Sequence, residues 1–212
     1  MHIEGASDLA VLLCDLCRSS GVTFLRYVYV GWELFDVDVA REIFSDSDLD
    51  LLRNIHLVLV YEDFGLVIDN FMLVALSVDY INEKSDVGVK LKNAIETVKS
   101  IVKCYDFGFD FIVAWYYFDR WVKDEVIRSF RATLSEVIGK LDLPIILLIT
   151  KVMVGNVLKM FSPFEVDARS DVAYIIRWLS NEVRDSRKLV LNSIDEEFLE
   201  SRVKLKELLG FI

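Results

Sequence analysis

The sequence predicts an α/β fold, with a three-layer α/β/α arrangement around a mixed, mainly parallel central sheet and a helical C-terminal part. The first observation is a pair of short, almost wholly apolar runs, Phe111–Tyr117 and Pro144–Ile149. A strand exposed on one face alternates polar and apolar residues, so these runs indicate strands covered on both faces. The second observation is that helix-periodic polar stretches flank both runs, which is typical of strands that pair in parallel.

The first half of the chain is predicted to mix helices and strands. A first helix is expected to be capped by Ser7 and to end at Gly21. Residues rich in β-branched and aromatic side chains then favour strands, and turn residues separate them. The expected elements are strands over residues 22–30, 55–60, 66–68 and 71–78, and short helices over residues 36–43 and from Ser47.

The second half is predicted to alternate. Ser85 is expected to cap a long helix that Gly108 ends, and Asp119 to cap the helix between the two apolar runs. Beyond Lys151 the chain is expected to be helical. The predicted helices there are 152–161, 168–183 and a last one that starts at the capping box Ser193-Ile-Asp-Glu196 and runs to Gly210.

The length and composition indicate one domain over residues 1–212, with residues 152–212 as a helical extension packed on it. Hydrophobic residues make up 54% of the chain, above the usual level of about 45–50%. This surplus indicates either a very full core or a second buried surface at an oligomer interface.

The charge of the chain restricts its partners. The net charge is −10, and lysines and arginines are interleaved with carboxylates, which argues against nucleic acid and against an anionic membrane as partners. No run long and apolar enough for a membrane span and no basic leader is present, so a cytoplasmic protein is expected. The chain contains no Gln, which favours a thermophilic, archaeal origin.

The best positional candidates for chemistry are Asp79, Asp119 and Lys151, each at the predicted carboxyl end of a strand. In open α/β sheets ligands bind beyond these ends, so two carboxylates and a lysine would converge if the strands are neighbours. Such a group can hold a divalent cation or act as acid and base. The alternative is structural, because Asp also caps helices and ends strands.

Other motifs point to structure rather than chemistry. Cys14 and Cys17 form a CxxC inside a predicted apolar helix, where two small core residues are the better interpretation. His56 lies in a predicted strand without a second internal His for a triad. No Gly-rich phosphate loop is present, and no cofactor is expected. The aromatic stretch from Tyr105 to Trp121 is interpreted as core plus interface.

From Ser47 to Tyr117 the expected order is helix, strand, strand, strand, helix, strand. This order resembles the core of the PD-(D/E)XK nuclease-like superfamily, whose members carry an acid on the second strand and an acid-x-Lys on the third. The resemblance implies metal-ligand roles for Asp69 and Asp79. The acid-x-Lys is absent, since Ala75-Leu-Ser77 or Ser77-Val-Asp79 stands in its place. The resemblance therefore implies an inactive copy of that fold.

Three hypotheses follow for function. The first is a non-catalytic protein that acts by protein contact, as a homodimer, supported by the apolar surplus, the aromatic stretch and the apolar end Leu208–Ile212. The second is an enzyme that uses Asp79, Asp119 and Lys151 with a metal or phosphorylated ligand. The third is an inactive nuclease-like scaffold.

Overall fold

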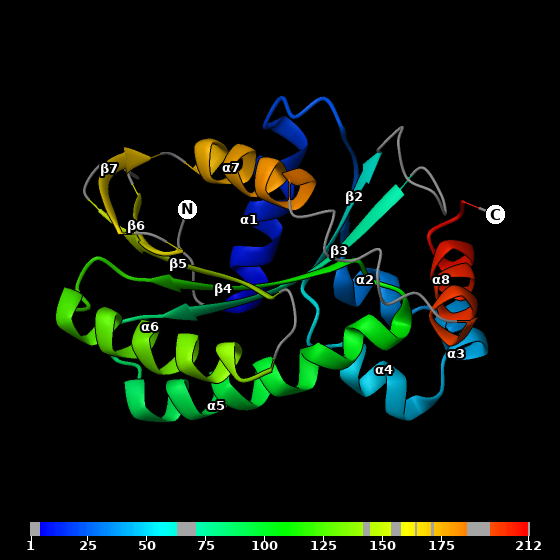
Figure 1. Ribbon diagram of the computed structural model, residues 1–212, viewed down its shortest axis with the longest axis horizontal. Helices are drawn as coiled ribbons and strands as arrows, with labels where there is room; N and C mark the ends of the chain where they lie inside the picture. The colour runs from blue at the N-terminus through cyan, green and yellow to red at the C-terminus, as the bar shows by residue number, and fades with distance from the viewer. Residues whose placement is uncertain are drawn as a thin grey trace.

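The computed structural model describes residues 5–62, 71–141, 145–153, 158–163, 165–170, 172–185 and 196–211. Its centre is a mixed sheet of seven strands in the order β1-β2-β3-β4-β5-β6-β7, covered by helices on both faces (Figure 1). The predicted α/β class with a mixed central sheet and a C-terminal helix is therefore confirmed.

Parallel pairing is confined to the middle of the sheet. β3 pairs with β4 and β4 with β5 in parallel, whereas the β1–β2, β2–β3, β5–β6 and β6–β7 pairs are antiparallel. The strands are β1 (Leu25–Val30), β2 (Leu57–Glu62), β3 (Phe71–Ile81), β4 (Phe111–Phe118), β5 (Ile145–Val152), β6 (Leu158–Ser162) and β7 (Val166–Ser170).

The helices form two unequal layers. On one face α1 (Ala6–Ser19) and α7 (Val172–Asp185) lie over the sheet, and the other helices lie on the opposite face (Figure 1). These are α2 (Gly31–Phe35), α3 (Asp38–Ile43), α4 (Asp46–Leu52), α5 (Val87–Ile101), the 3-10 helix η1 (Val102–Phe107), α6 (Asp124–Gly139) and α8 (Glu196–Leu208). Each layer encloses its own hydrophobic core against the sheet.

The two apolar runs become the adjacent parallel strands β4 and β5, as predicted. Every side chain of β4 is buried, and alternate residues of the strand enter the two different cores. The buried indole of Trp115 donates a hydrogen bond to Thr150 Oγ1 at 2.9 Å, so the polar atoms inside this region are paired. Full burial on both faces explains why these strands lack alternation.

The predicted helix over residues 152–161 is wrong, because this region contributes the end of β5 and the strand β6. Lys151 pairs with Lys159 across the two strands. Along β6, Leu158 and Met160 enter the core under α1 and α7, and Phe161 enters the opposite core. The sequence contains this two-residue period. It does not show that β5 has an edge whose backbone groups need a hydrogen-bonding partner, which β6 supplies. The helix predicted over residues 168–183 likewise begins later, at Val172, after β7.

Three predicted helix caps are displaced. Gly5, not Ser7, precedes α1, and Asp86, not Ser85, caps α5 by accepting hydrogen bonds from Gly88 N and Val89 N. Asp119 is followed by a turn, and α6 begins after Lys123. The predicted capping box at residues 193–196 begins outside the described residues.

The C-terminal helix is held by a buried arginine. Arg202 is 3% exposed, and its guanidinium donates to Gly108 O at 2.9 Å, to Asp110 Oδ2 at 2.8 Å and to Phe71 O at 2.5 Å. Gly108 has φ +87°, and a side chain there would lie within 3 Å of the Arg202 backbone. This glycine therefore permits both the end of η1 and the close approach of α8.

Candidate functional site at the carboxyl ends of the parallel strands

The first predicted site residue, Asp79, lies near the end of β3 and forms an ion pair with α5. Lys90 Nζ is 2.8 Å from Asp79 Oδ1 and 3.1 Å from Oδ2. Both side chains are roughly 30% exposed, at 30% for Lys90 and 27% for Asp79. This carboxylate therefore already has a cation as its partner.

His56, at the start of β2, lies close enough to Asp79 for their charges to interact. Its Nδ1 accepts a hydrogen bond from Val78 N at 3.2 Å, which fixes the proton of the neutral ring on Nε2. Burial lowers the pKa of His56, and the nearby Asp79 and a hydrogen bond that the ring donates to the backbone of Asn54 oppose this shift. His56 is therefore a neutral hydrogen-bond acceptor that helps to fix the end of β3.

The second predicted residue, Asp119, follows β4 and accepts a hydrogen bond from the Tyr80 hydroxyl at 3.3 Å. The ring of Tyr80 packs beside Tyr117, with their centroids 6.1 Å apart. Two residues beyond Asp119, the side chain of Trp121 is 61% exposed, and the Arg120 guanidinium lies 4.6 Å from its ring centroid. An aromatic surface residue therefore accompanies the polar groups at this end of the sheet.

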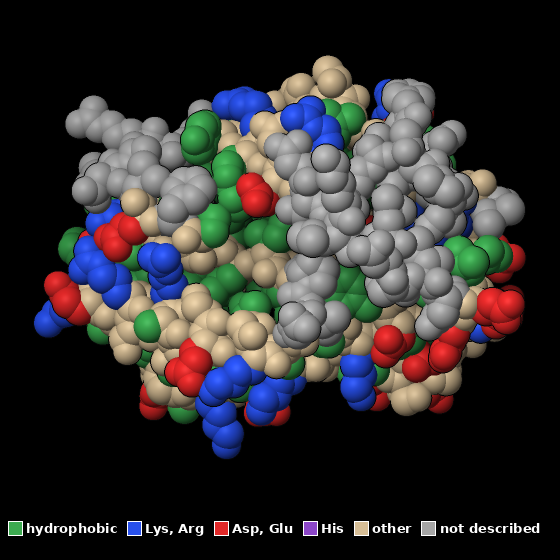
Figure 2. Space-filling view, viewed as in Figure 1, with side chains coloured by type: hydrophobic (Ala, Val, Ile, Leu, Met, Phe, Trp, Pro, Cys, Tyr) green, Lys and Arg blue, Asp and Glu red, His purple; other side chains and the backbone are tan. Residues whose placement is uncertain are grey.

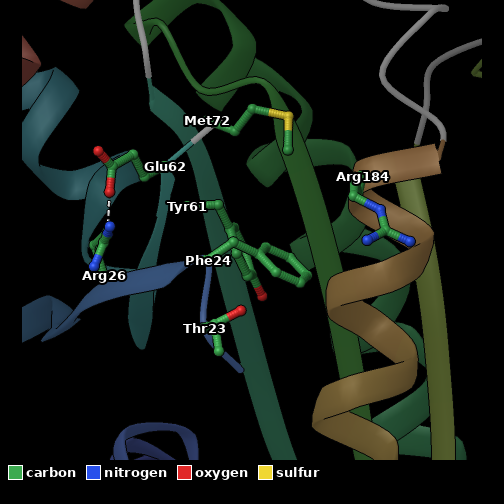
Figure 3. Close-up of a pocket in the computed structure, with 7 residues that line it drawn as sticks. All are labelled: Thr23, Phe24, Arg26, Tyr61, Glu62, Met72 and Arg184. Atoms are coloured by element: carbon green, nitrogen blue, oxygen red, sulfur yellow. Dashed lines mark hydrogen bonds and ion pairs between the residues drawn. The ribbon is translucent and has the colours of Figure 1, made fainter. Parts of the chain in front are cut away.

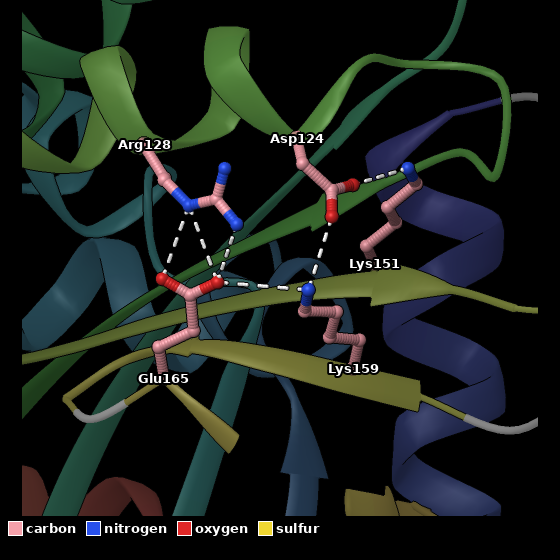
Figure 4. A network of polar contacts seen from close by, with 5 residues as sticks. All are labelled: Asp124, Arg128, Lys151, Lys159 and Glu165. Carbon is pink, nitrogen blue, oxygen red and sulfur yellow. Dashed lines mark hydrogen bonds and ion pairs between the residues drawn. The ribbon is translucent and has the colours of Figure 1, made fainter. Parts of the chain in front are cut away.

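The third predicted residue, Lys151, belongs to a network of five charged side chains (Figure 4). Its Nζ lies 2.6 Å from Asp124 Oδ1, and Lys159 Nζ lies 3.0 Å from the other oxygen of the same carboxylate. Glu165 lies 3.5 Å from Lys159 Nζ and 2.8 Å from Arg128 Nη2. The network joins β5, β6 and residue 165 to the first turns of α6.

The two lysines are the buried part of this network, since their side chains are 10% and 12% exposed. Burial acts to raise the pKa of Asp124, but hydrogen bonds and charges from Lys151 and Lys159 act more strongly and hold that pKa below 3.8. The position of Asp124 in the first turn of α6 also suits a negative charge. Asp124 is therefore the shared counter-ion of both lysines.

The structure separates two of the three predicted residues and gives each of the three a partner of its own. Asp79 lies opposite Tyr116 in the register, and Lys151 lies opposite Phe118, so β4 separates them. Each has a different internal partner, on α5, on β3 and on α6 respectively. Figure 2 shows basic and acidic side chains intermixed at this end of the molecule, on the left of the view. This arrangement suits ion pairing that fixes the helices to the sheet.

Metal binding finds no support in this geometry. Among the described residues, no three or more His, Cys, Asp or Glu side chains are grouped so that they could hold a metal ion. Asp69, the other predicted metal ligand, lies outside the described residues. Asp124 and Lys159 could not be predicted as part of this network, because their side chains come into contact only when β5 and β6 pair.

The remaining sequence candidates are core residues. Cys14 and Cys17 are buried on the inner face of α1, which confirms their interpretation as core. Burial raises the pKa of Cys17 to about 12, so its thiol stays protonated and unreactive at neutral pH. Most of the aromatic stretch is also buried, with Trp121 as its exposed exception.

Comparison with known proteins gives no match: no family model, no curated protein and no solved structure resembles this chain. Among the described residues, no helix has both the length and the apolar character that a membrane span needs.

Proposed function

We propose that this is a non-catalytic α/β protein that acts by protein contact and associates with a second copy of itself through α8. The observation that carries the proposal is the exposure of apolar side chains on this helix, whose inner face already buries Leu205 as well as a cation. Its inner face contains the buried cation Arg202, whereas Leu199 and Val203, one turn apart on its outer face, are 37% and 48% exposed.

The apolar surface continues onto neighbouring elements. α3 packs against α8 (Figure 1), and Val37 and Val39 at its start are 42% and 51% exposed. On β1, Tyr27 is 49% exposed and contacts Phe211, with 5.3 Å between the ring centroids. Exposed apolar residues gathered on adjoining elements are typical of a protein–protein interface. We call these five residues the α8 surface: Tyr27, Val37, Val39, Leu199 and Val203.

The charge pattern of α8 favours a second copy as the partner. The helix begins with three carboxylates, Glu196, Glu197 and Glu200, whereas its end carries two lysines, Lys204 and Lys206, beside the single carboxylate Glu207. Two α8 helices packed antiparallel about a two-fold axis place the acidic start of each beside these lysines of the other. The same packing places Leu199 of one copy opposite Val203 of the other.

The oligomeric state tests this proposal directly. Sedimentation velocity of the wild-type protein is expected to show a dimer, and Val203→Glu is expected to weaken dimerisation by about tenfold or more, since it buries an unpaired charge at the contact. Val89→Glu is the matched control, because Val89 on α5 is 55% exposed and lies outside the α8 surface. A monomeric wild type, or equal effects of the two variants, would overturn the proposal.

A charge exchange tests the antiparallel arrangement. Glu200→Lys and Lys204→Glu are each expected to weaken the dimer, because each places like charges together. The double variant is expected to recover much of the loss, as a double-mutant cycle between contacting residues does. Additive losses in the double variant would rule out this packing.

A second candidate, the inactive nuclease-like scaffold, draws on the order of elements from Ser47 to Tyr117. The described elements there are α4, β2, β3, α5, η1 and β4. The expected short strand over residues 66–68 lies outside the described residues. A nuclease assay with Mg²⁺ and Mn²⁺ is expected to show no cleavage, and this candidate is compatible with self-association.

A further inference from the structure

A second region of interest is the outer edge of the sheet at β1. β1 pairs with β2 on one side, and among the described strands none pairs with its other side. The Val28 carbonyl accepts a hydrogen bond from Arg18 Nη2 at 3.0 Å, so the backbone groups of Val28 face the open edge, whereas those of Tyr27 and Tyr29 face β2. An edge of this kind can pair with a further strand.

A pocket of about 360 Å³ runs along this edge, beside the last turn of α1. Every residue from Leu25 to Tyr29 lines it. Successive side chains of a strand point to opposite faces of the sheet, so an unbroken run of lining residues places the pocket along the edge of the strand. Leu25 and Tyr29 are half-buried and Tyr27 is 49% exposed, which makes the edge accessible. The side chain of Val28 enters the core, so its backbone is the part that reaches the pocket.

The charge of this pocket is positive. Arg18 and Arg26 line it, both exposed, and none of the described residues in its wall is an Asp or Glu. Arg26 Nε forms an ion pair with Glu62 on β2 (Figure 3), and Arg18 uses Nη2 for the Val28 carbonyl. Each guanidinium retains further N–H groups that can bind a carboxylate. In a chain whose net charge is −10, this edge favours an acidic partner.

The two arginines also argue against a second copy as the occupant of this edge. Antiparallel pairing of two β1 strands about a two-fold axis brings Arg18 and Arg26 of both copies together, and these like charges repel. Charged side chains on an edge strand are a common protection against such pairing. An extended acidic segment meets the same arginines with the opposite charge.

We propose that the outer edge of β1 binds an extended acidic peptide segment of a partner protein. The segment adds a strand to the sheet through the N–H and the carbonyl of Val28, and its carboxylates are bound by Arg18 and Arg26. Arg18 keeps its own hydrogen bond, because a backbone carbonyl has two lone pairs and accepts a second donor. The proposal does not rest on self-association, and this edge shares only Tyr27 with the α8 surface.

Isothermal titration calorimetry of the full chain with an end-blocked hexapeptide of alternating Glu and Val tests the proposal. We expect one peptide to bind per chain, and the neutral analogue with Gln in place of each Glu to bind about tenfold more weakly. Arg18→Ala and Arg26→Ala are each expected to weaken binding of the acidic peptide by about fivefold or more. Arg177→Ala is the control, because Arg177 is an exposed arginine on α7 and is not part of the pocket.

Two methylated forms of the acidic peptide separate strand pairing from attraction by charge alone. One form is N-methylated at its Glu residues and the other at its Val residues. The N–H groups of successive residues point to opposite edges of a strand, so each form blocks one edge of the peptide. We expect at least one form to bind about tenfold more weakly, whichever direction the peptide runs, because its N–H groups no longer reach β1.

Glu62→Gln gives an effect of opposite sign, since it removes the carboxylate that competes for Arg26, and is expected to tighten binding several-fold. Equal affinity for the acidic and neutral peptides, no effect of either arginine variant, no loss in either methylated form, or no binding at all would overturn the proposal. Val203→Glu is expected to bind the peptide as the wild type does. Sedimentation of that variant therefore reports on self-association separately.

Discussion

Charged and apolar side chains are placed in opposite ways at the two ends of this molecule. At the carboxyl ends of β3, β4 and β5, the lysines and carboxylates pair with one another, and the two lysines of the network are nearly buried. At the α8 surface, the charged Arg202 is buried and apolar Leu199 and Val203 face outward. The charged side chains described at the strand ends have partners within the chain, whereas the α8 surface leaves apolar side chains exposed.

This difference shows that the position of a residue in a fold does not by itself reveal a site. The strand ends are where α/β proteins bind ligands, yet here Asp79, Asp119 and Lys151 each have an internal partner. The α8 surface consists of four aliphatic side chains and one tyrosine, and their exposure is the feature that points to a partner.

The largest effect is expected at Arg202. Replacing it with Ala leaves Asp110 and two backbone carbonyls without this guanidinium, so the free energy of unfolding should fall by about 3–5 kcal/mol. Chemical denaturation measures this loss. Lys92→Ala, at an exposed position on α5 outside the α8 surface, should change stability by less than about 0.5 kcal/mol. Similar effects of the two variants would show that Arg202 does not anchor α8.

A smaller loss is expected at the other end for Asp124→Asn. Two nearly buried lysines lose their shared counter-ion, and the loss should be about 2 kcal/mol at neutral pH because Asp124 itself is partly exposed. The folded-state pKa of Asp124 lies below 3.8, so the stability it contributes is complete at neutral pH and is lost as the pH falls below 3.8 through that pKa. The difference between variant and wild type should therefore shrink in strong acid. A difference that stays constant with pH would contradict the ionic role.

Asp79→Asn should cost about 1 kcal/mol or less, because its ion pair with Lys90 is about one-third exposed. The enzyme hypothesis makes a different prediction, since a metal ligand at Asp79 would give a rise in melting temperature with Mg²⁺ or Mn²⁺. We expect no such rise in the wild type. A metal-dependent rise that Asp79→Asn abolishes would replace the structural interpretation.

The smallest stability effects are expected at exposed apolar residues, where Trp121→Ala and Leu199→Ser should each change the free energy of unfolding by less than about 0.5 kcal/mol. They differ in their effect on self-association. Leu199→Ser should weaken the dimer, and Trp121→Ala, at the ion-paired end, should not. Dimer loss in Trp121→Ala would move the interface to the strand ends.

The interior of the fold was predictable because each local pattern has one physical cause. Unbroken apolar runs predicted β4 and β5, helical periodicity predicted α5 and α6, and Gly108 predicted the end of the helical segment that closes with η1. The sequence predicts a helix after Lys151, but the structure has the end of β5 and the strand β6 there. The apolar pattern over Leu158–Phe161 is too short to distinguish a strand from a helix, and only pairing with a neighbouring strand decides between them. The partners of the candidate residues could not be predicted for the same reason, since Lys90, Tyr80 and Asp124 come from other elements.

The sequence by itself determined the α/β class, the central strands and the acidic character of the chain. Each of these follows from the residue types in one segment and does not depend on which segments come into contact. Only the tertiary structure decided which charges meet and which apolar residues stay outside. The physical reason is that an ion pair or an exposed surface depends on the relative placement of elements that lie far apart along the chain. Arg202, charged in sequence and buried in the fold, and Val203, apolar in sequence and exposed, show this most directly.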